Sequence, residues 1–300
     1  MKQALHPQSD PQELLQVPHQ RIRALAETDR AAVQQLLQHY PLESVFLQGL
    51  LDDHGLCSPK LRGQFFGWFK NNELAAVALL GHQILFCGDP AALPSFAQTA
   101  VESKAKGFVV FGPKAEVDRL GQLFSSRGRA TQTVKDFCWY VCEKAARSTA
   151  QWQMQQASLE HLEVILALQA QLHLEATGVD PRLADPDGFR ERVAARIERG
   201  RTWIKMEAGQ LVFKAELQSV TPTAVYLEGI WTNPDFRGLN IAKECVLELT
   251  ERRLHQQQTI CLAVEPEETA ARHIYESAGF RQQGEYQALY LQPLGEPSPC

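Results

Sequence analysis

The sequence predicts a mixed α/β fold built as two similar halves, each a mixed central sheet flanked by helices. The chain has 300 residues, which suits two domains of about 150 residues each. Two segments share one design: a short alternating stretch, a helix start, and then apolar residues at helical spacing. They are Arg21–His39 and Gln151–Leu172. After each, strand-like runs alternate with helical ones, which is typical of a sheet with helices on its faces.

The expected organisation has three parts: a flexible lead-in over residues 1–20, a first domain over 21–145 and a second over 151–295. The lead-in is polar and spaced by prolines, and it lacks the apolar segment of a secretory signal. Between the domains, Glu143–Ala150 is rich in small and charged residues, which is typical of a linker.

In the first domain, apolar and aromatic runs separated by turn residues predict strands. They are Gly63–Lys70, Glu73–Gly81, Gln83–Gly88, Gly107–Gly112 and Asp136–Glu143. Helical spacing predicts helices over Ala91–Ala105 and Ala115–Ser126.

In the second domain, a helix over Ser158–Leu174 is followed by the irregular stretch Glu175–Gly188 and a helix over Phe189–Arg199. Strands are predicted next. They are Thr202–Glu207, Leu211–Val220, Ala224–Thr232, Thr259–Val264 and Glu285–Gln292. Two further helices separate the last three strands, one from about Ile241 and one over about Thr269–Ala278.

Composition argues against several classes of protein. No apolar run approaches 18 residues, so no membrane-spanning helix is expected. The net charge of −5 and a pI near 6.0 argue against a nucleic-acid-binding face. The seven cysteines are scattered and form no Cys-x-x-Cys pair. We therefore expect buried thiols rather than a disulfide framework or zinc site, no metal cofactor, and a reducing, cytoplasmic setting.

The stretch Gly229–Leu249 joins a strand to a helix through a tight turn. The first turn of a helix has unpaired N–H groups and a partial positive charge, so it attracts anions. Arg237 adds a full positive charge, and Gly238 lets a ligand approach the backbone. The same pattern also fits an ordinary strand-to-helix connection.

The residues Asn233–Ala242 resemble the acyl-CoA pyrophosphate loop of the GNAT superfamily of N-acetyltransferases, with the pattern Arg/Gln-x-x-Gly-x-Gly/Ala. Arg237 matches the first position and Ala242 the last, while Asn240 stands where the pattern has glycine. Asn tolerates positive φ well, so we expect the backbone shape to be kept. The resemblance implies that this segment binds acetyl-CoA through Arg237, Gly238, Leu239, Asn240, Ile241 and Ala242.

A second stretch, Pro266–Phe280, resembles the other GNAT signature, Asn-x-x-Ala-x-x-x-Tyr ending in Gly-Phe. A tyrosine at this position protonates the leaving thiolate in the family, which implies that role for Tyr275. A tyrosine on an apolar helix face is also compatible with a simple core position. Glu268 stands where the family has Asn, so a negative charge replaces an amide beside the pantetheine arm.

The strand Ala224–Thr232 offers Glu228. Alternation places Tyr226, Glu228 and Ile230 on one face. In the resembling family a glutamate on this strand acts as a base through water, and an amine acceptor needs one because it is largely protonated near neutral pH. A surface or ion-paired glutamate is the alternative. The resemblance also implies that main-chain groups hold pantetheine and polarise the thioester carbonyl. These belong to Ile230, Trp231 and Thr232.

Acceptor contacts are less defined. Lys214 and Glu216 share one face of their strand, where they either pair with each other or line an acceptor pocket. The segment Leu174–Gly188 lies where superfamily members build the acceptor side, and Glu175 there would suit a cationic amine.

No Arg-x-x-Gly-x-Gly/Ala pattern occurs between residues 20 and 145, so the first domain is expected to be a degenerate GNAT-like half. The expected function is transfer of an acetyl group from acetyl-CoA to a primary amine by direct attack, with a small molecule or peptide as acceptor. Nucleic-acid and membrane partners are not expected, and a homodimer is left open. The alternatives are a non-catalytic acyl-CoA sensor and a tandem GNAT-like aminoacyl transferase that uses charged tRNA.

Overall fold

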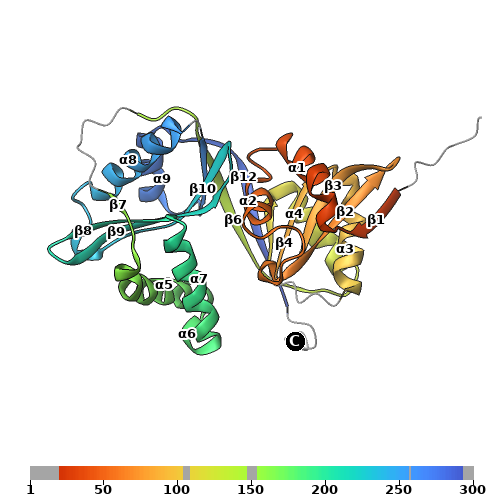
Figure 1. Ribbon diagram of the computed structural model, residues 1–300, viewed down its shortest axis with the longest axis horizontal. Helices are drawn as coiled ribbons and strands as arrows, with labels where there is room; N and C mark the ends of the chain where they lie inside the picture. Colours follow the sequence, from red (N-terminus) through yellow and green to blue (C-terminus); the bar gives the residue numbers. More distant parts are fainter. Residues whose placement is uncertain (1–19, 104–108, 147–153, 257, 293–300) are drawn as a thin grey trace, which may run out of the picture.

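The computed structural model describes residues 20–103, 109–146, 154–256 and 258–292 (Figure 1). The expected lead-in over 1–20 lies outside the described residues except for Gln20, and the expected linker Glu143–Ala150 is described only as far as residue 146.

Within these ranges twelve strands form one sheet in the order β1-β2-β3-β4-β5-β12-β6-β11-β10-β9-β8-β7. Their bounds are β1 Gln20–Ala24, β2 Gly63–Lys70, β3 Glu73–Gly81, β4 Gln83–Gly88, β5 Val109–Pro113, β6 Thr131–Cys142, β7 Gln155–Gln156, β8 Thr202–Glu207, β9 Gln210–Val220, β10 Ala224–Thr232, β11 Thr259–Val264 and β12 Arg281–Leu291.

The helices lie on both faces of the sheet. Their bounds are α1 Arg30–Gln38, α2 Val45–His54, α3 Leu93–Glu102, α4 Lys114–Ser125, α5 Leu162–Thr177, α6 Pro181–Ala184, α7 Pro186–Glu198, α8 Ile241–His255 and α9 Thr269–Ala278. In the second half, α5–α7 lie on one side of the sheet and α8 and α9 on the other (Figure 1). Among the described residues no helix has the length and apolarity needed to cross a membrane.

The sheet is symmetrical about the contact between β12 and β6. Outward from this contact, one side runs β12-β5-β4-β3-β2-β1 and the other β6-β11-β10-β9-β8-β7. The pairs β4–β5 and β10–β11 are parallel, and the other pairs are antiparallel. Strand β6, from the first half of the chain, therefore lies between two strands of the second half, and β12 lies next to β5 of the first. Neither half completes its sheet without a strand from the other.

Aromatic side chains fill the core at this exchange. Trp139 of β6 stacks on Tyr286 of β12 with ring centroids 3.9 Å apart, and on Tyr226 of β10 at 5.8 Å. Phe46 of α2 packs against Tyr226 at 4.3 Å. Large buried aromatic surfaces contribute strongly to core stability, so these contacts hold the two halves together.

Polar contacts from α2 also join the halves. Both terminal nitrogens of Arg201, just before β8, donate to the carboxylate of Asp53 at 2.5 and 2.7 Å. The hydroxyl of Ser219 in β9 donates to the carbonyl of Val45 at 2.5 Å. Helix α2 of the first half thus packs against β9 and against β10, which is the strand that carries Glu228.

Most predicted elements are confirmed, and the differences have local causes. The stretch Glu175–Gly188, predicted to be irregular, contains the end of α5, all of α6 and the start of α7. Two Asp-Pro pairs start the latter helices, since Asp180 accepts from the N–H of Arg182 and Asp185 from that of Gly188. Asp at the N-cap followed by Pro at the first helical position is a strong helix start. Helix α2 had no counterpart among the predicted elements.

Candidate active site

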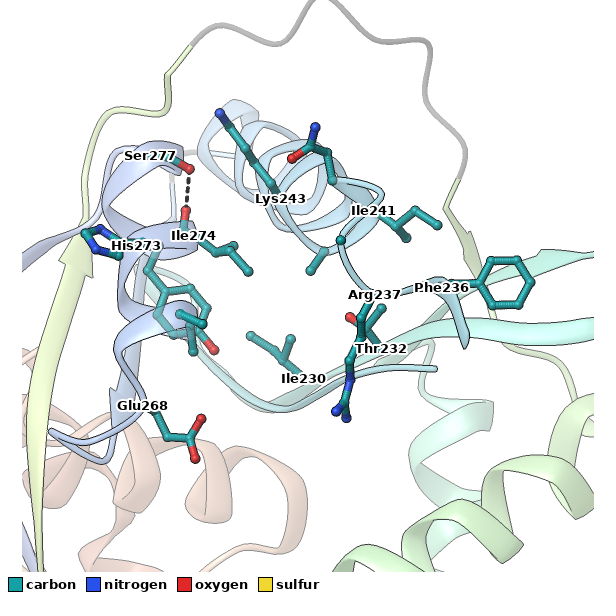
Figure 2. Close-up of a pocket in the computed structure, with 16 residues that line it drawn as sticks. Ile230, Thr232, Phe236, Arg237, Ile241, Lys243, Glu268, His273, Ile274 and Ser277 are labelled. Atoms are coloured by element: carbon teal, nitrogen blue, oxygen red, sulfur yellow. Dashed lines mark hydrogen bonds between the residues drawn. The ribbon is translucent and has the colours of Figure 1, made fainter. Parts of the chain in front are cut away.

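A cavity of about 770 Å³ lies between the C-terminal part of β10, the start of α8 and helix α9 (Figure 2). Pockets of this size commonly hold cofactors and other small ligands. Its lining includes eight of the predicted cofactor-binding residues and one predicted catalytic residue. They are Ile230, Thr232, Arg237, Gly238, Asn240, Ile241, Ala242, Glu268 and Tyr275.

The loop at one side of the cavity presents an open helix N-terminus. Asn240 is the N-cap of α8 with φ of 61°, and its side chain makes no capping hydrogen bond. The predicted positive φ at Asn240 is therefore confirmed. Gly238 has φ of 78°, so the turn uses two left-handed residues, Gly238 and Asn240 on either side of Leu239, to lead into the helix. The first-turn N–H groups of α8 have no side-chain cap, which leaves them available to an anion.

Positive charge adjoins this helix end. Arg237 and Lys243 both line the cavity, Arg237 from the loop and Lys243 from the first turn of α8 (Figure 2). Glu268, at the start of α9, is the acidic residue of the lining. The lining thus includes two cationic residues and one carboxylate, and the partial positive charge of the α8 N-terminus favours an anionic group at that end.

Tyr275 lines the cavity from α9 and is only 8% exposed. Its ring packs against Phe280 at 5.9 Å and Tyr140 at 6.4 Å. Burial, followed by the nearby Glu268 charge, raises the pKa of Tyr275 to about 12. The hydroxyl is therefore protonated near neutral pH.

Strand β10 has a bulge at Gly229, which changes which residues share a face. Glu228 pairs with Glu216 of β9, but the next pair is Trp231 with Lys214, so β10 has one residue more than β9. Paired residues on adjacent strands point to the same face. Glu228 therefore shares a face with Trp231, and the prediction that Glu228 and Ile230 lie on one face is wrong. The physical reason is the bulge, where Gly229 has φ of 59°.

Because of this bulge, Ile230 and Glu228 approach the site from opposite sides. Ile230 lines the cavity, whereas Glu228 does not belong to its lining. Trp231 also lies outside the lining and packs in the core beneath α5 and α7. Leu239, in the loop, is 63% exposed and does not belong to the lining.

Glu228 is accessible to solvent but closely surrounded by protein. Reduced solvation raises its pKa; the charge of Glu216 acts in the same direction, and those of Arg196 and Lys214 oppose it. A carboxylate with a raised pKa is a better base near neutral pH than an ordinary glutamate.

The predicted acceptor residues are divided by the structure. Lys214 and Glu216 are buried and paired, with 3.3 Å between Nζ and Oε1. Glu175 is exposed on α5 and accepts a hydrogen bond from Gln171 at 2.9 Å. The structure therefore brings Lys214 and Glu216 close to Glu228, and leaves Glu175 as a solvated surface carboxylate.

Some residues of the candidate site were missed by the sequence analysis. Seven further residues line the cavity: Phe236, Lys243, Ala270, Ala271, His273, Ile274 and Ser277. The signal for Lys243 was its place in the first turn of a helix that was predicted to bind an anion. Gln169 and Arg196, which bind Glu216, had no local signal because their partner is distant in sequence. Across the described ranges, no group of three or more His, Cys, Asp or Glu residues could hold a metal ion.

Comparison with known proteins agrees with this geometry. Residues 167–280 match the family described as "Acetyltransferase (GNAT) family". These residues form a GNAT domain. The match includes α8, α9 and every strand from β8 to β11, and so contains the whole lining of the cavity. No curated protein matches the chain.

Solved structures show the same fold over nearly the whole chain. A GNAT acetyltransferase from Colwellia psychrerythraea is 17% identical, with 90% of this chain and 99% of that chain covered and a TM-score of 0.55. A tandem GNAT protein from the clavulanic acid biosynthesis pathway is 10% identical, with 93% and 100% covered and a TM-score of 0.55. A Drosophila protein is 12% identical, with 91% and 98% covered and a TM-score of 0.64. The first half is therefore also GNAT-like in fold.

The first half differs from the GNAT domain at the place that corresponds to the anion loop, which is residues 233–242 from the end of β10 into the start of α8. There α3 follows β4 as α8 follows β10, but the connection is only the short segment Asp89–Ala92. Its helical start is capped by the carboxylate of Asp89, which accepts from the N–H of Ala91 at 2.9 Å. A carboxylate occupies the position where the second half leaves N–H groups open, so this end of the first half disfavours phosphate.

Proposed function

We propose that the GNAT domain transfers an acetyl group from acetyl-CoA to a primary amine on a small molecule or peptide. The observation that carries the proposal is a single cavity that joins an uncapped helix N-terminus, two cationic side chains and a protonated tyrosine. Phosphate binding and protonation of a leaving group are the two tasks that this donor imposes on the protein.

The residues present fit acetyl-CoA. The uncapped N-terminus of α8 and the side chain of Arg237 would hold the pyrophosphate. Gly238 and Ala242 are small where the ligand must approach the main chain. Ile230, Ala271 and Ile274 supply apolar surface for the arm between the phosphates and the thioester. Bound acetyl-CoA would supply the acyl group as an activated thioester.

The transfer needs one base and one acid. The amine nitrogen bonds to the acyl carbon as the carbon–sulfur bond breaks, so the amine loses a proton and the sulfur gains one. Glu228 would take the first proton through water from the side of the strand opposite the cavity, and its raised pKa suits that role. Tyr275 lines the cavity as a protonated hydroxyl and would give a proton to the sulfur.

A second candidate function is supported by particular residues. Glu268 places a negative charge in the cavity, and Glu228 does not line it. Both features suit a domain that binds acyl-CoA without turnover.

Calorimetric titration with acetyl-CoA tests the donor site. We expect one site per chain. Arg237→Glu should weaken binding at least about tenfold, since it removes a charge-assisted contact and adds repulsion. Arg119→Glu makes the same charge change on the exposed face of α4 and should leave affinity unaltered. Two sites, or an unchanged affinity for Arg237→Glu, would contradict the assignment.

Release of free CoA thiol with a panel of primary amines tests the reaction. We expect turnover by the unmodified protein, and a kcat lowered about a hundredfold in Tyr275→Phe at unchanged affinity for acetyl-CoA. Full activity of Tyr275→Phe would remove the acid role. Binding without turnover across the whole panel would support the sensor instead.

A further inference from the structure

A buried ion pair lies directly behind the bulge of β10. The ammonium of Lys214 is fully buried, and it contacts the Glu216 carboxylate at 3.3 Å. It also donates to the carbonyl of Gly229, the bulge residue, at 3.2 Å. A bulge leaves a backbone group unpaired by its neighbouring strand, so this contact gives the Gly229 carbonyl a partner that the ladder does not.

The same carboxylate ties the bulge to the helices on that face. Gln169 of α5 donates to Oε1 of Glu216 at 2.6 Å, and Arg196 of α7 forms a short ion pair with Oε2. Glu216 therefore binds three groups from three elements. Nearby positive charge outweighs the effect of burial and lowers the pKa of Glu216, so it is ionised near neutral pH.

Stability alone does not account for this arrangement. A buried ion pair carries a large desolvation cost, and apolar residues of similar volume are often at least as stabilising. Burial also lowers the pKa of Lys214, which shows the cost of holding its charge there. An arrangement of this kind is more readily explained by what it does to the neighbouring groups, which are Gly229 and Glu228.

Glu228 lies opposite Glu216 in the strand register. The charged groups that act on it come from two elements: Glu216 and Lys214 of β9, and Arg196 of α7. Ile230, the residue after the bulge glycine, lines the cavity. The ion pair thus contacts the backbone between the proposed base and the proposed donor site.

We propose that Lys214 and Glu216 are positioning residues for acyl transfer: they hold the Gly229 carbonyl, which orients the main chain at Ile230 toward the donor, and they set the charge around Glu228. This inference rests on the proposed function. It assigns Lys214 and Glu216 to the reaction and not to binding of the acceptor.

The two charges act on Glu228 with opposite signs, and this provides the test. Lys214→Met removes a positive charge and should raise the pKa of Glu228, which moves the acid limb of the pH–kcat/KM profile to higher pH. Glu216→Gln removes a negative charge and should move that limb to lower pH. Each shift should be roughly 0.5 to 1 pH unit, below the range for fully buried pairs because Glu228 reaches solvent. Both variants should lower kcat and leave acetyl-CoA affinity within about twofold.

A matched control is available on the adjacent strand. Lys205 pairs with Glu207 at 3.0 Å, also two residues apart, and Lys205 is likewise buried. Lys205→Met should leave the acid limb in place. A purely structural role would change the stability of Lys214→Met and Glu216→Gln without shifting their acid limbs in opposite directions. Shifts of the same sign, or none, would overturn the inference. Glu216→Gln keeps the size of the side chain but replaces one of the two acceptor oxygens by an NH2 donor, so part of this network is lost. Where Lys214→Met does not fold, the direction of the shift in Glu216→Gln still decides the question, because only a move of its acid limb to lower pH supports the inference.

Carboxyl NMR separates this inference from the proposed function. The titration of Glu228, assigned with Glu228→Gln, can be followed in the unmodified protein and in both variants without any turnover. Opposite shifts of its pKa in an inactive protein would support the charge assignment and contradict acyl transfer. An active protein whose Glu228 titrates identically in all three would contradict the inference and leave the proposed function standing.

Discussion

The conformation of Asn240 allows a sharp test of how the anion loop is built. Its φ of 61° lies in the left-handed region, which costs an ordinary residue about 1 to 2 kcal/mol. Asn bears less of this cost, and its side chain makes no capping hydrogen bond that a substitution would lose. Asn240→Ala should therefore lower the free energy of unfolding by about 1 kcal/mol. Asn240→Gly should be nearly neutral, because relief of strain offsets the greater freedom of glycine in the unfolded chain.

The same pair of variants reports on the site. Since Asn240 lines the cavity, a loop that leaves the left-handed conformation would misplace the first N–H groups of α8. We expect Asn240→Ala to bind acetyl-CoA more weakly than Asn240→Gly, which should bind as well as the unmodified protein or better. Urea denaturation and calorimetry measure the two effects. Leu239→Ala, at an exposed position beside it, is the control and should alter stability by less than about 0.5 kcal/mol. Equal stability and affinity of Asn240→Ala and Asn240→Gly would refute the reasoning.

Three further predictions follow from the contacts described. Asp53→Asn should lower the free energy of unfolding, measured by urea denaturation, by about 2 kcal/mol, because it breaks the largely buried double contact between Asp53 and Arg201. A decrease of less than about 0.5 kcal/mol would contradict this. Glu228→Gln should raise the melting temperature at pH values above the raised pKa of Glu228, because the folded protein no longer has to hold a poorly solvated charge there. This gain should disappear at pH values below the ordinary pKa of glutamate, and a gain that grows toward acid pH would contradict the raised pKa. A fragment of residues 147–300, without β6, should fail to give a cooperative unfolding transition, and a folded fragment that binds acetyl-CoA would show that the exchanged strand is dispensable.

The backbone shape of the loop before α8 could be predicted because its information is local. Arg237, Gly238 and Asn240 lie within four consecutive residues, and the tolerance of Asn for positive φ is a property of the residue itself. Helix α9 was predicted over about Thr269–Ala278 for a similar reason, since its apolar spacing and the terminating Gly279 are both local signals. The cavity follows from these two elements once the sheet places them side by side.

Features that depend on partners distant in sequence could not be predicted. Period-two alternation assumes a regular strand, and the bulge at Gly229 appears only when β10 is aligned with β9. The network around Glu216 joins α5, α7 and β9, and no pattern in any one of these segments indicates the others. The exchange of β6 and β12 belongs to the same class, because it pairs Thr131–Cys142 with residues about 150 positions later.

The exchange explains how a half without an anion loop can still serve the site. Strand β6 is apolar from Cys138 to Cys142, as expected of a strand with neighbours on both edges and cover on both faces. It supports β11, which in turn pairs with β10, the strand that carries Glu228 and Ile230. The first half also brings α2 against β9 and β10. At Asp89 a carboxylate caps the helical start of the first half and leaves all of these contacts intact, so the first half contributes to the fold of the GNAT domain through its strands and packing rather than through a phosphate site of its own.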